Sequence, residues 1–251
     1  MALFFVFSPM EFTEGVPLTL LPEESHHIFQ VLRAGAGDEL ILFDGSGKIA
    51  PCQALKAGPR VSAVLPGKVR EHLPPPIRLH LLQGIVKSPS MEDILRRGAE
   101  LGVAEIHPIL CRHCAIGRRG GSGKLPHWKS IAVAACKQSK NPFLPSIHSP
   151  LHLATALESI PESAPLIAAS LEPGALSWGE FCRGHLQNFS KKCGDIFVAV
   201  GPEGDFSPDE YALLRRRNCT PVRLGPRILT AETAALTLLG ALQFELECTL
   251  A

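Results

Sequence analysis

Two glycine-containing segments near the end of the sequence have the residue types of a small-molecule site. In each segment a short apolar run leads into a tight loop and then into a helical pattern; the loops are Gly201-Pro-Glu-Gly204 and Leu224-Gly-Pro-Arg-Ile-Leu229. Glycine lets the backbone approach a ligand closely. Loops at the carboxyl ends of neighbouring strands are where open α/β sheets bind ligands. We therefore expect these two loops to form one cofactor site.

The residue types in the two loops also limit which cofactor could bind. Arg227 and Glu203 are the charged side chains, and the others are glycine, proline or apolar. A triphosphate site needs a lysine with a neighbouring serine or threonine, and both loops lack that pair. Backbone polar groups beside apolar side chains suit an adenine ring and a sulfonium-bearing tail.

Two other glycine motifs match nucleotide-binding patterns only in spelling. Gly45-Ser-Gly-Lys-Ile-Ala50 fits a dinucleotide fingerprint, but strand-like residues follow it where a helix is required, so it predicts a hairpin turn. Gly123-Lys124 resembles the end of a phosphate loop. Arg118 stands at the position of that motif's first glycine and Leu125 at its serine or threonine, which excludes the phosphate-loop interpretation.

The metal and nucleophile motifs are incomplete. Cys111 and Cys114 have the spacing of half a zinc site, but no second pair follows at finger spacing, so we expect no metal there. His26 and His27 open a helical segment without a Ser or Cys nucleophile motif. For this histidine pair a surface or RNA-contacting role is favoured over catalysis.

Basic residues gather in one part of an otherwise balanced chain. The net charge is +1, yet residues 106–150 contain no Asp or Glu. A local excess of this kind is typical of a surface that binds a polyanion, although an ordinary solvated face is the alternative. The basic residues of this stretch are Arg112, Arg118, Arg119, Lys124, Lys129, Lys137 and Lys140.

The pattern of elements predicts an α/β protein with two domains. Residues 1–72 have short strand patterns and one helix over 22–33, whose spacing places Ile28, Val31 and Leu32 on a buried face. The stiff segment Leu73-Pro-Pro-Pro76 marks a domain boundary. From residue 73 to 251 strands and helices alternate, which predicts a mainly parallel sheet.

Two helix starts in this second domain can be predicted from their first residues. Ser88 is expected to cap one helix with Pro89 at its first position. Ser207-Pro-Asp-Glu210 has the spelling of a capping box.

Composition excludes several classes of protein. No apolar stretch approaches the ~20 residues of a membrane span, and the N-terminus has neither a basic region nor a small-residue cleavage site. The eight cysteines are scattered, which favours reduced thiols. We expect a cytoplasmic protein.

Several motifs, in order, resemble the SPOUT superfamily of trefoil-knotted methyltransferases, and within it the bacterial 16S ribosomal RNA 3-methyluridine methyltransferases. Residues 201–207 match the family's G-P-E-G-G-F-S, and residues 224–234 match its L-G-x-R-I-L-R-x-E-T-A. Residues 100–103 follow Lys87 as the family's E-L-G-V follows its lysine. His26-His27, residues 31–33, 37–38 and 43–45 resemble the family's PUA-like RNA-binding domain.

The resemblance implies a knotted C-terminal domain over residues 73–251, a PUA-like β-barrel over 1–72, and a homodimer. It implies S-adenosylmethionine as cofactor, 16S ribosomal RNA of the small subunit as substrate, and no metal. The RNA contacts expected are His26, Arg33, Arg112, Arg118, Arg119, Lys124, Lys137 and Lys140. The cofactor contacts expected are Ser170, Leu171, Glu172, Val200, Gly201, Pro202, Gly204, Leu224, Gly225, Arg227, Ile228, Leu229, Thr233 and Ala234.

The chain departs from the family pattern at two places. Asp205 stands where the family has a second glycine. Lys140-Asn141, after Gln138-Ser139, stands where the family has Gly-Arg. Lys140 could supply the missing cation, but lysine lacks the bidentate fork of arginine.

Methyl transfer to N3 of a uridine requires loss of the N3 proton. Arg227 is expected to stabilise the resulting negative charge, with an ion pair to Glu232 as the structural alternative. Glu203 is expected to orient the base or accept its proton. Two other functions stay open: a SPOUT enzyme acting on another RNA or on a ribose 2′-hydroxyl, and a non-catalytic RNA-binding or ribosome-assembly factor.

Overall fold

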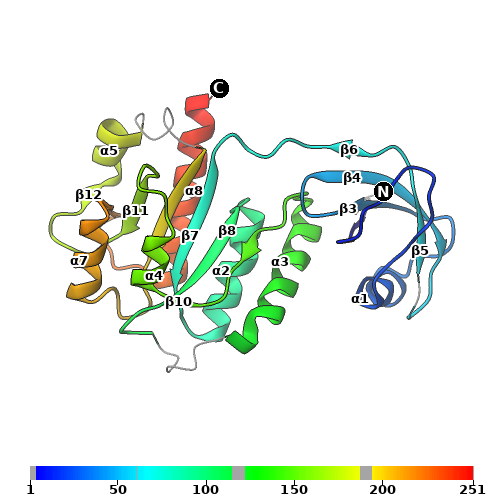
Figure 1. The fold of residues 1–251 in the computed structure, drawn as a ribbon, viewed down its shortest axis with the longest axis horizontal. Coiled ribbons are helices and arrows are strands. Elements are labelled where there is room, and N and C mark those ends of the chain that lie inside the picture. Colours follow the sequence, from blue (N-terminus) through cyan, green and yellow to red (C-terminus); the bar gives the residue numbers. More distant parts are fainter. Residues whose placement is uncertain (1–3, 61, 115–121, 187–193, 251) are drawn as a thin grey trace. The chain divides into compact units, whose positions relative to one another are not determined.

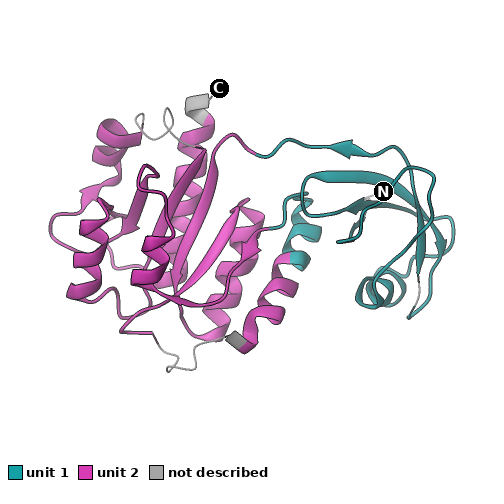
Figure 2. Cartoon of the chain, viewed as in Figure 1, with its two compact units in different colours: residues 1–74, 133–144 teal, residues 75–132, 145–251 magenta. Residues whose placement is uncertain are grey.

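The computed structural model describes residues 4–60, 62–114, 122–186 and 194–250 (Figure 1). The chain divides into two compact units. The first contains residues 1–74 and 133–144, and the second contains residues 75–132 and 145–251 (Figure 2).

The first unit is built on a mixed, six-stranded sheet. The strand order is β1-β3-β4-β5-β2, with β6 paired to β4. The β1–β3 pair is parallel and the other pairs are antiparallel. The strands are β1 (Phe4–Phe7), β2 (Leu18–Thr19), β3 (Glu39–Phe43), β4 (Lys48–Lys56), β5 (Ala63–Pro66) and β6 (Arg70–Glu71).

The expected hairpin at residues 44–47 is confirmed between β3 and β4. Oδ1 of Asp44 accepts hydrogen bonds from the backbone N–H groups of Ser46 (2.7 Å) and Lys48 (3.1 Å). Gly47 has φ +110°, a conformation that favours glycine. The turn residues therefore set the register of the two strands.

The expected helix over residues 22–33 is α1 (Pro22–His26) followed by a π-helical turn, η1 (His27–Val31). Ile28 is buried as predicted, but the prediction for Val31 was wrong, because its exposure is 62%. The π turn makes i→i+5 hydrogen bonds, so residues in it leave the 3.6-residue period that the sequence pattern assumed.

The second unit is built on an eight-stranded sheet in which all pairs are parallel, which confirms the predicted α/β class. The strand order is β10-β8-β7-β13-β11-β14-β12, with β9 paired to β8. The strands are β7 (Arg78–Gly84), β8 (Glu105–Leu110), β9 (Ser146–Ile147), β10 (Leu151–His152), β11 (Leu166–Ala169), β12 (Leu176–Ser177), β13 (Asp195–Val200) and β14 (Thr220–Arg223).

Helices cover both faces of this sheet (Figure 1). One face packs against α4 and α7 in a core that includes Phe197 and Leu82, and α8 contacts β13 and β11 and packs against α2. The helical segments are α2 (Ser88–Glu100), η2 (Ser122–Lys124), α3 (Leu125–Ser139), α4 (Leu153–Glu158), α5 (Trp178–Phe181), η3 (Cys182–Leu186), α7 (Pro208–Arg216) and α8 (Ala231–Leu250).

The two predicted helix starts have different outcomes. At α7 the capping box is confirmed: the Glu210 N–H donates to the Ser207 hydroxyl, and the Ser207 N–H donates to the Glu210 carboxylate. At α2 the prediction was wrong. Lys87 is the cap residue, and Ser88 lies inside the first turn. The Ser88 hydroxyl accepts a hydrogen bond from Nζ of Lys124 instead (2.5 Å).

None of the helices in the described part of the chain combines the length and the apolar character that spanning a bilayer requires. The passage of the C-terminal segment through a knot stays a prediction.

Candidate active site

A pocket opens at the carboxyl ends of three adjacent strands, β13, β11 and β14. The loop after each strand and the start of α8 contribute its walls. Because the strands are parallel, these loops meet at one edge of the sheet, as expected for an α/β ligand site. The lining residues are Ala169, Ser170, Leu171, Val200, Gly201, Pro202, Glu203, Asp205, Arg223, Leu224, Arg227, Ile228, Leu229, Ala231 and Ala234.

Most of the residues predicted for cofactor contact lie in this lining. Four of them do not line it: Glu172, Gly204, Gly225 and Thr233. Glu172 points to a neighbouring hollow, where its carboxylate binds Arg215 at 2.7 Å. The Thr233 hydroxyl lies 3.0 Å from that of Thr230, which precedes α8. The sequence reasoning missed Ala169, Asp205, Arg223 and Ala231 as lining residues.

Two glycines shape the edges of the site. Gly84 ends β7, and a Cβ there would lie 2.5 Å from the backbone nitrogen of Pro202. Only glycine therefore lets β7 end against the first loop. Gly225 has φ +131° and open space beside its Cα, so its conformation rather than crowding favours glycine in the second loop.

The two predicted catalytic residues have different surroundings. Arg227 is exposed, and among the described residues it has no carboxylate, that of Glu232 included, within ion-pair distance. Its guanidinium is thus available to a ligand. Glu203 accepts a hydrogen bond from the backbone N–H of Lys87 (3.1 Å) at the start of α2. This contact holds the carboxylate at the pocket wall.

Asp205, in the loop after β13, contacts Tyr211 of α7. Tyr211 is the single tyrosine of the chain. Both Asp205 carboxylate oxygens lie 2.9 Å from the Tyr211 hydroxyl. Burial raises the pKa of Tyr211, the Ser170 side chain lowers it, and hydrogen bonding to Asp205 raises it further. Tyr211 therefore stays protonated at neutral pH and donates to Asp205.

Asp205 has φ +60°, which explains why the family has glycine at this position. Aspartate is one of the few other residues that adopt the left-handed region, because its short side chain bonds locally. Here the Asp205 carboxylate accepts a hydrogen bond from the N–H of Phe206 (2.8 Å). Lys140 at the second departure also replaces a family glycine, and its φ is +59°. Both residues thus adopt a backbone conformation that favours glycine.

The predicted RNA contacts are divided between the two units. In the first unit His26, Arg33 and Lys140 are exposed, whereas Lys137 forms an ion pair of 2.9 Å with the buried Glu24. Only 14% of the Lys137 side chain is exposed, so this lysine is not a free surface cation.

In the second unit Arg112 is exposed, and Lys124 is half-buried against Ser88. Arg118 and Arg119 lie outside the described residues.

Cys111 and Cys114 lie just after β8 and interact with each other. The hydrogen bond from the Cys111 thiol lowers the pKa of Cys114 to about 7, and that same contact raises the pKa of Cys111. The backbone N–H of Cys111 also donates to Sγ of Cys114 (3.2 Å). Sγ of Cys114 also lies 3.6 Å from the Ile109 carbonyl oxygen. The two cysteines thus form a hydrogen-bonded pair at a strand end.

Two family models match the chain. The RNA methyltransferase domain matches residues 73–243, and the RNA methyltransferase PUA domain matches residues 20–60. A protein of Aquifex aeolicus named ribosomal RNA small subunit methyltransferase E is 30% identical over 227 residues. The alignment covers 90% of this chain and 93% of that relative.

Two solved structures resemble the whole chain. A protein of Legionella pneumophila described as a methyltransferase, in complex with the cofactor SAM, has a TM-score of 0.85 at 30% identity. It covers 97% of this chain, which covers 98% of it. The ribosomal RNA small subunit methyltransferase E of Neisseria gonorrhoeae, bound to S-adenosyl methionine, has a TM-score of 0.85 at 26% identity and the same coverage. This chain therefore belongs to the ribosomal RNA small subunit methyltransferase E family, SPOUT RNA methyltransferases with a PUA domain.

Proposed function

We propose that this protein transfers the methyl group of S-adenosylmethionine to N3 of a uridine in the 16S RNA of the small ribosomal subunit. The family and the names of its relatives support the reaction class and the substrate. The observation that carries the proposal is that three loops, distant in sequence, line one pocket and contain most of the expected cofactor residues.

The pocket residues suit this cofactor. The walls are mainly apolar, and Leu171, Leu224, Ile228 and Leu229 would enclose an adenine ring while loop backbone groups bind its polar edge. Bound there, S-adenosylmethionine supplies an activated methyl group on a positively charged sulfonium.

Arg227 and Glu203 act on the uridine in this proposal. Loss of the N3 proton leaves negative charge on the pyrimidine, and the unpaired Arg227 guanidinium stabilises it. One Glu203 oxygen is held by the Lys87 N–H. The other oxygen has no hydrogen-bond partner in the described part of the chain and is available to orient the base or to accept the N3 proton. The reaction then depends on positioning and on charge stabilisation.

RNA binding would use both domains, residues 1–72 and 73–251. N3 lies on the Watson–Crick edge, so the target base must be unpaired or extruded before it reaches Arg227. The exposed cations His26, Arg33, Arg112 and Lys140 would contact the phosphate backbone.

A homodimer is part of the same proposal. Large apolar side chains are exposed next to the pocket and on α8: 53% of Leu171, 81% of Ile228 and 65% of Phe244. A second copy covering this surface would remove it from water. A substrate in the ribosome places the protein in the cytoplasm.

Transfer of an isotope-labelled methyl group from S-adenosylmethionine to small-subunit RNA tests the proposal, with calorimetry of the cofactor as the companion measurement. Cofactor binding with labelled RNA supports it. Absence of cofactor binding contradicts it and favours a non-catalytic RNA-binding protein.

A further inference from the structure

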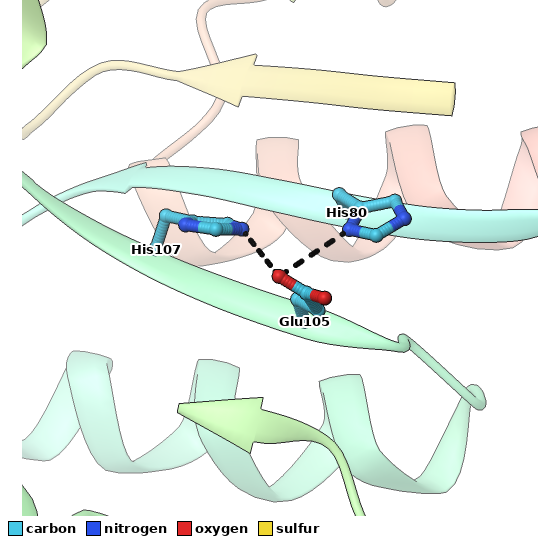
Figure 3. A group of neighbouring side chains, drawn as sticks. All are labelled: His80, Glu105 and His107. Carbon is cyan, nitrogen blue, oxygen red and sulfur yellow. Dashed lines mark ion pairs between the residues drawn. The ribbon is translucent and has the colours of Figure 1, made fainter. Parts of the chain in front are cut away.

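Three chemically active side chains converge at the amino ends of β7 and β8, the opposite edge of the sheet from the cofactor pocket (Figure 3). His80 pairs in register with Glu105, and Leu82 pairs with His107. Because side chains alternate between the faces of a strand, His80, Glu105 and His107 project from the same face. The parallel register thus places His80 beside two residues that lie 25 or more positions further along the sequence.

The ligand atoms of this group lie close enough for one metal ion to reach all of them. They lie within 4.8 Å of one another. Oε2 of Glu105 is 3.7 Å from Nδ1 of His80 and 3.1 Å from Nε2 of His107. Nε2 of His148, just after β9, is 2.8 Å from the same oxygen. Zinc bonds of about 2.1 Å in a tetrahedron separate the ligand atoms by about 3.4 Å, so small side-chain movements complete the site.

His80 presents an unpartnered lone pair to this group. Its ring is buried, with 5% of the side chain exposed, and it stacks on Phe197 with a centroid distance of 4.5 Å. Nε2 lies 2.8 Å from Oδ1 of Asp195, a contact that places the proton of a neutral ring on Nε2. Nδ1 is buried without a hydrogen-bond partner among the described residues and faces Glu105. The Nδ1 lone pair and the Glu105 carboxylate oxygen, 3.7 Å apart, could together bind a cation.

The Asp195 contact is also what a metal-binding histidine needs on its far side. Metal-bound histidines donate their other N–H to a carboxylate, which fixes the tautomer and the ring orientation. Asp195 is itself held by Arg78, whose Nε and Nη2 lie 2.7 and 2.9 Å from its carboxylate oxygens. The chain Arg78–Asp195–His80 therefore orients Nδ1 toward Glu105.

His107 and His148 complete the donor set. Their rings stack with centroids 4.2 Å apart. The His107 Nε2 atom is buried, and its 3.1 Å contact with Glu105 Oε2 lacks hydrogen-bond geometry, so it has no hydrogen-bond partner among the described residues. His148 is 42% exposed and gives an ion a route from solvent.

We propose that His80 Nδ1, His107 Nε2 and the Glu105 carboxylate bind one divalent transition-metal ion, with His148 Nε2 as the fourth ligand. Imidazole and carboxylate donors are typical ligands of zinc. The ion would join β7, β8 and the segment after β9. Its place at the edge opposite the pocket makes it a structural clamp, independent of methyl transfer.

Zinc binding to the purified full-length chain, freed of metal with a chelator, tests the proposal by calorimetry and thermal unfolding. We expect one ion per chain and a higher melting temperature. His107→Gln should weaken binding by about 100-fold or more, and Asp195→Asn by about 10- to 100-fold, since it removes only the outer support. The exposed His152 lies outside the group, so His152→Gln should bind as the unaltered chain does.

Cobalt(II) absorption identifies the donor atoms directly. Nitrogen and oxygen donors in a tetrahedral site give visible ligand-field bands without the near-ultraviolet thiolate band. The paired replacement Cys111→Ser and Cys114→Ser should leave this spectrum unchanged. Three results would overturn the proposal: no bound ion, binding unaffected by His107→Gln in a folded variant, or a spectrum that depends on the two cysteines.

Discussion

The Tyr211 hydroxyl lies 2.9 Å from each carboxylate oxygen of Asp205, and so α7 is joined to the first loop of the cofactor pocket. Asp205 occupies a left-handed backbone position where related proteins have glycine. The hydrogen bond from Tyr211 offsets the conformational cost of a side chain there. At this departure from the family pattern, an aspartate that accepts a hydrogen bond from Tyr211 therefore takes the place of glycine.

Replacing Tyr211 with Phe should lower the free energy of unfolding by about 1 kcal/mol, because a hydrogen bond to a partly exposed carboxylate is lost. In an Asp205→Gly background the same replacement should have a smaller effect, because the Asp205 acceptor is already absent and only the contact with Ser170 remains to be lost. Chemical denaturation of the four proteins gives the coupling between the two residues. Equal effects in both backgrounds would show that the contact contributes no stability.

Arg227→Ala should reduce methyl transfer by about 100-fold or more, as expected for removal of a charge that stabilises a developing anion. Cofactor affinity should change little, because the pocket has many other walls. Arg216→Ala is the matched control, an exposed arginine on α7 outside this pocket. Single-turnover methylation and calorimetry separate the two effects, and full activity of Arg227→Ala would remove Arg227 from the mechanism.

Lys137→Ala should destabilise the protein by on the order of 3 kcal/mol, because it leaves the Glu24 carboxylate buried and unpaired. Lys129→Ala, on the exposed side of α3, should have an effect near zero. Thermal or denaturant unfolding checks this. Similar stabilities for the two variants would indicate that Lys137 is a surface cation after all.

Lys140→Gly should raise the stability of the protein while weakening its binding to RNA. Glycine removes the cost of a side chain at φ +59°, which is up to about 1 kcal/mol. The greater conformational entropy of glycine in the unfolded chain offsets part of this gain. Loss of one phosphate contact should reduce the slope of log RNA affinity against log salt concentration by about one. Lys140→Ala is the control: it should lose the same affinity without the gain in stability. Unchanged RNA affinity in both variants would exclude Lys140 from the interface.

Cys114 should react with alkylating reagents in a pH-dependent way with a midpoint of about 7, since the Cys111 thiol stabilises its thiolate. A lowered pKa means that the reactive form is present above this pH and is lost below it. Cys111→Ala should move the midpoint upward because it removes the thiol donor that stabilises the thiolate. Mass-spectrometric labelling over pH 5–9 measures both, and an unshifted midpoint would assign the thiolate to another cause.

Local chemistry was predictable from the sequence where it is set by adjacent residues. The capping box at Ser207 and the hairpin at residues 44–47 depend on side chains that bond within a few positions. The pocket loops were predictable because parallel strands end at a common edge. Val31 was misplaced because a π turn changes the helical period, which no residue type signals.

Contacts between distant residues were not predictable from spacing alone. The sequence pattern predicts Lys137 as an RNA contact. Its ion pair with Glu24 is a tertiary contact over 113 positions, which residue spacing does not reveal. The group of His80, Glu105 and His107 depends on the register between β7 and β8. The sequence does contain one signal of this group. Glu105-Ile-His107 places titratable residues at alternate positions of an otherwise apolar strand, which predicts a strand face with polar partners.

Nucleoside analysis of 16S RNA from small subunits that lack the modification, after treatment with this protein and methyl-labelled S-adenosylmethionine, tests the central claim most directly. Digestion to nucleosides and mass spectrometry against standards should reveal 3-methyluridine as the labelled nucleoside. With Arg227→Ala the label should fall by about 100-fold or more. Label in a ribose 2′-O-methyl nucleoside, or no labelled nucleoside with a cofactor-binding protein, would contradict the proposed reaction.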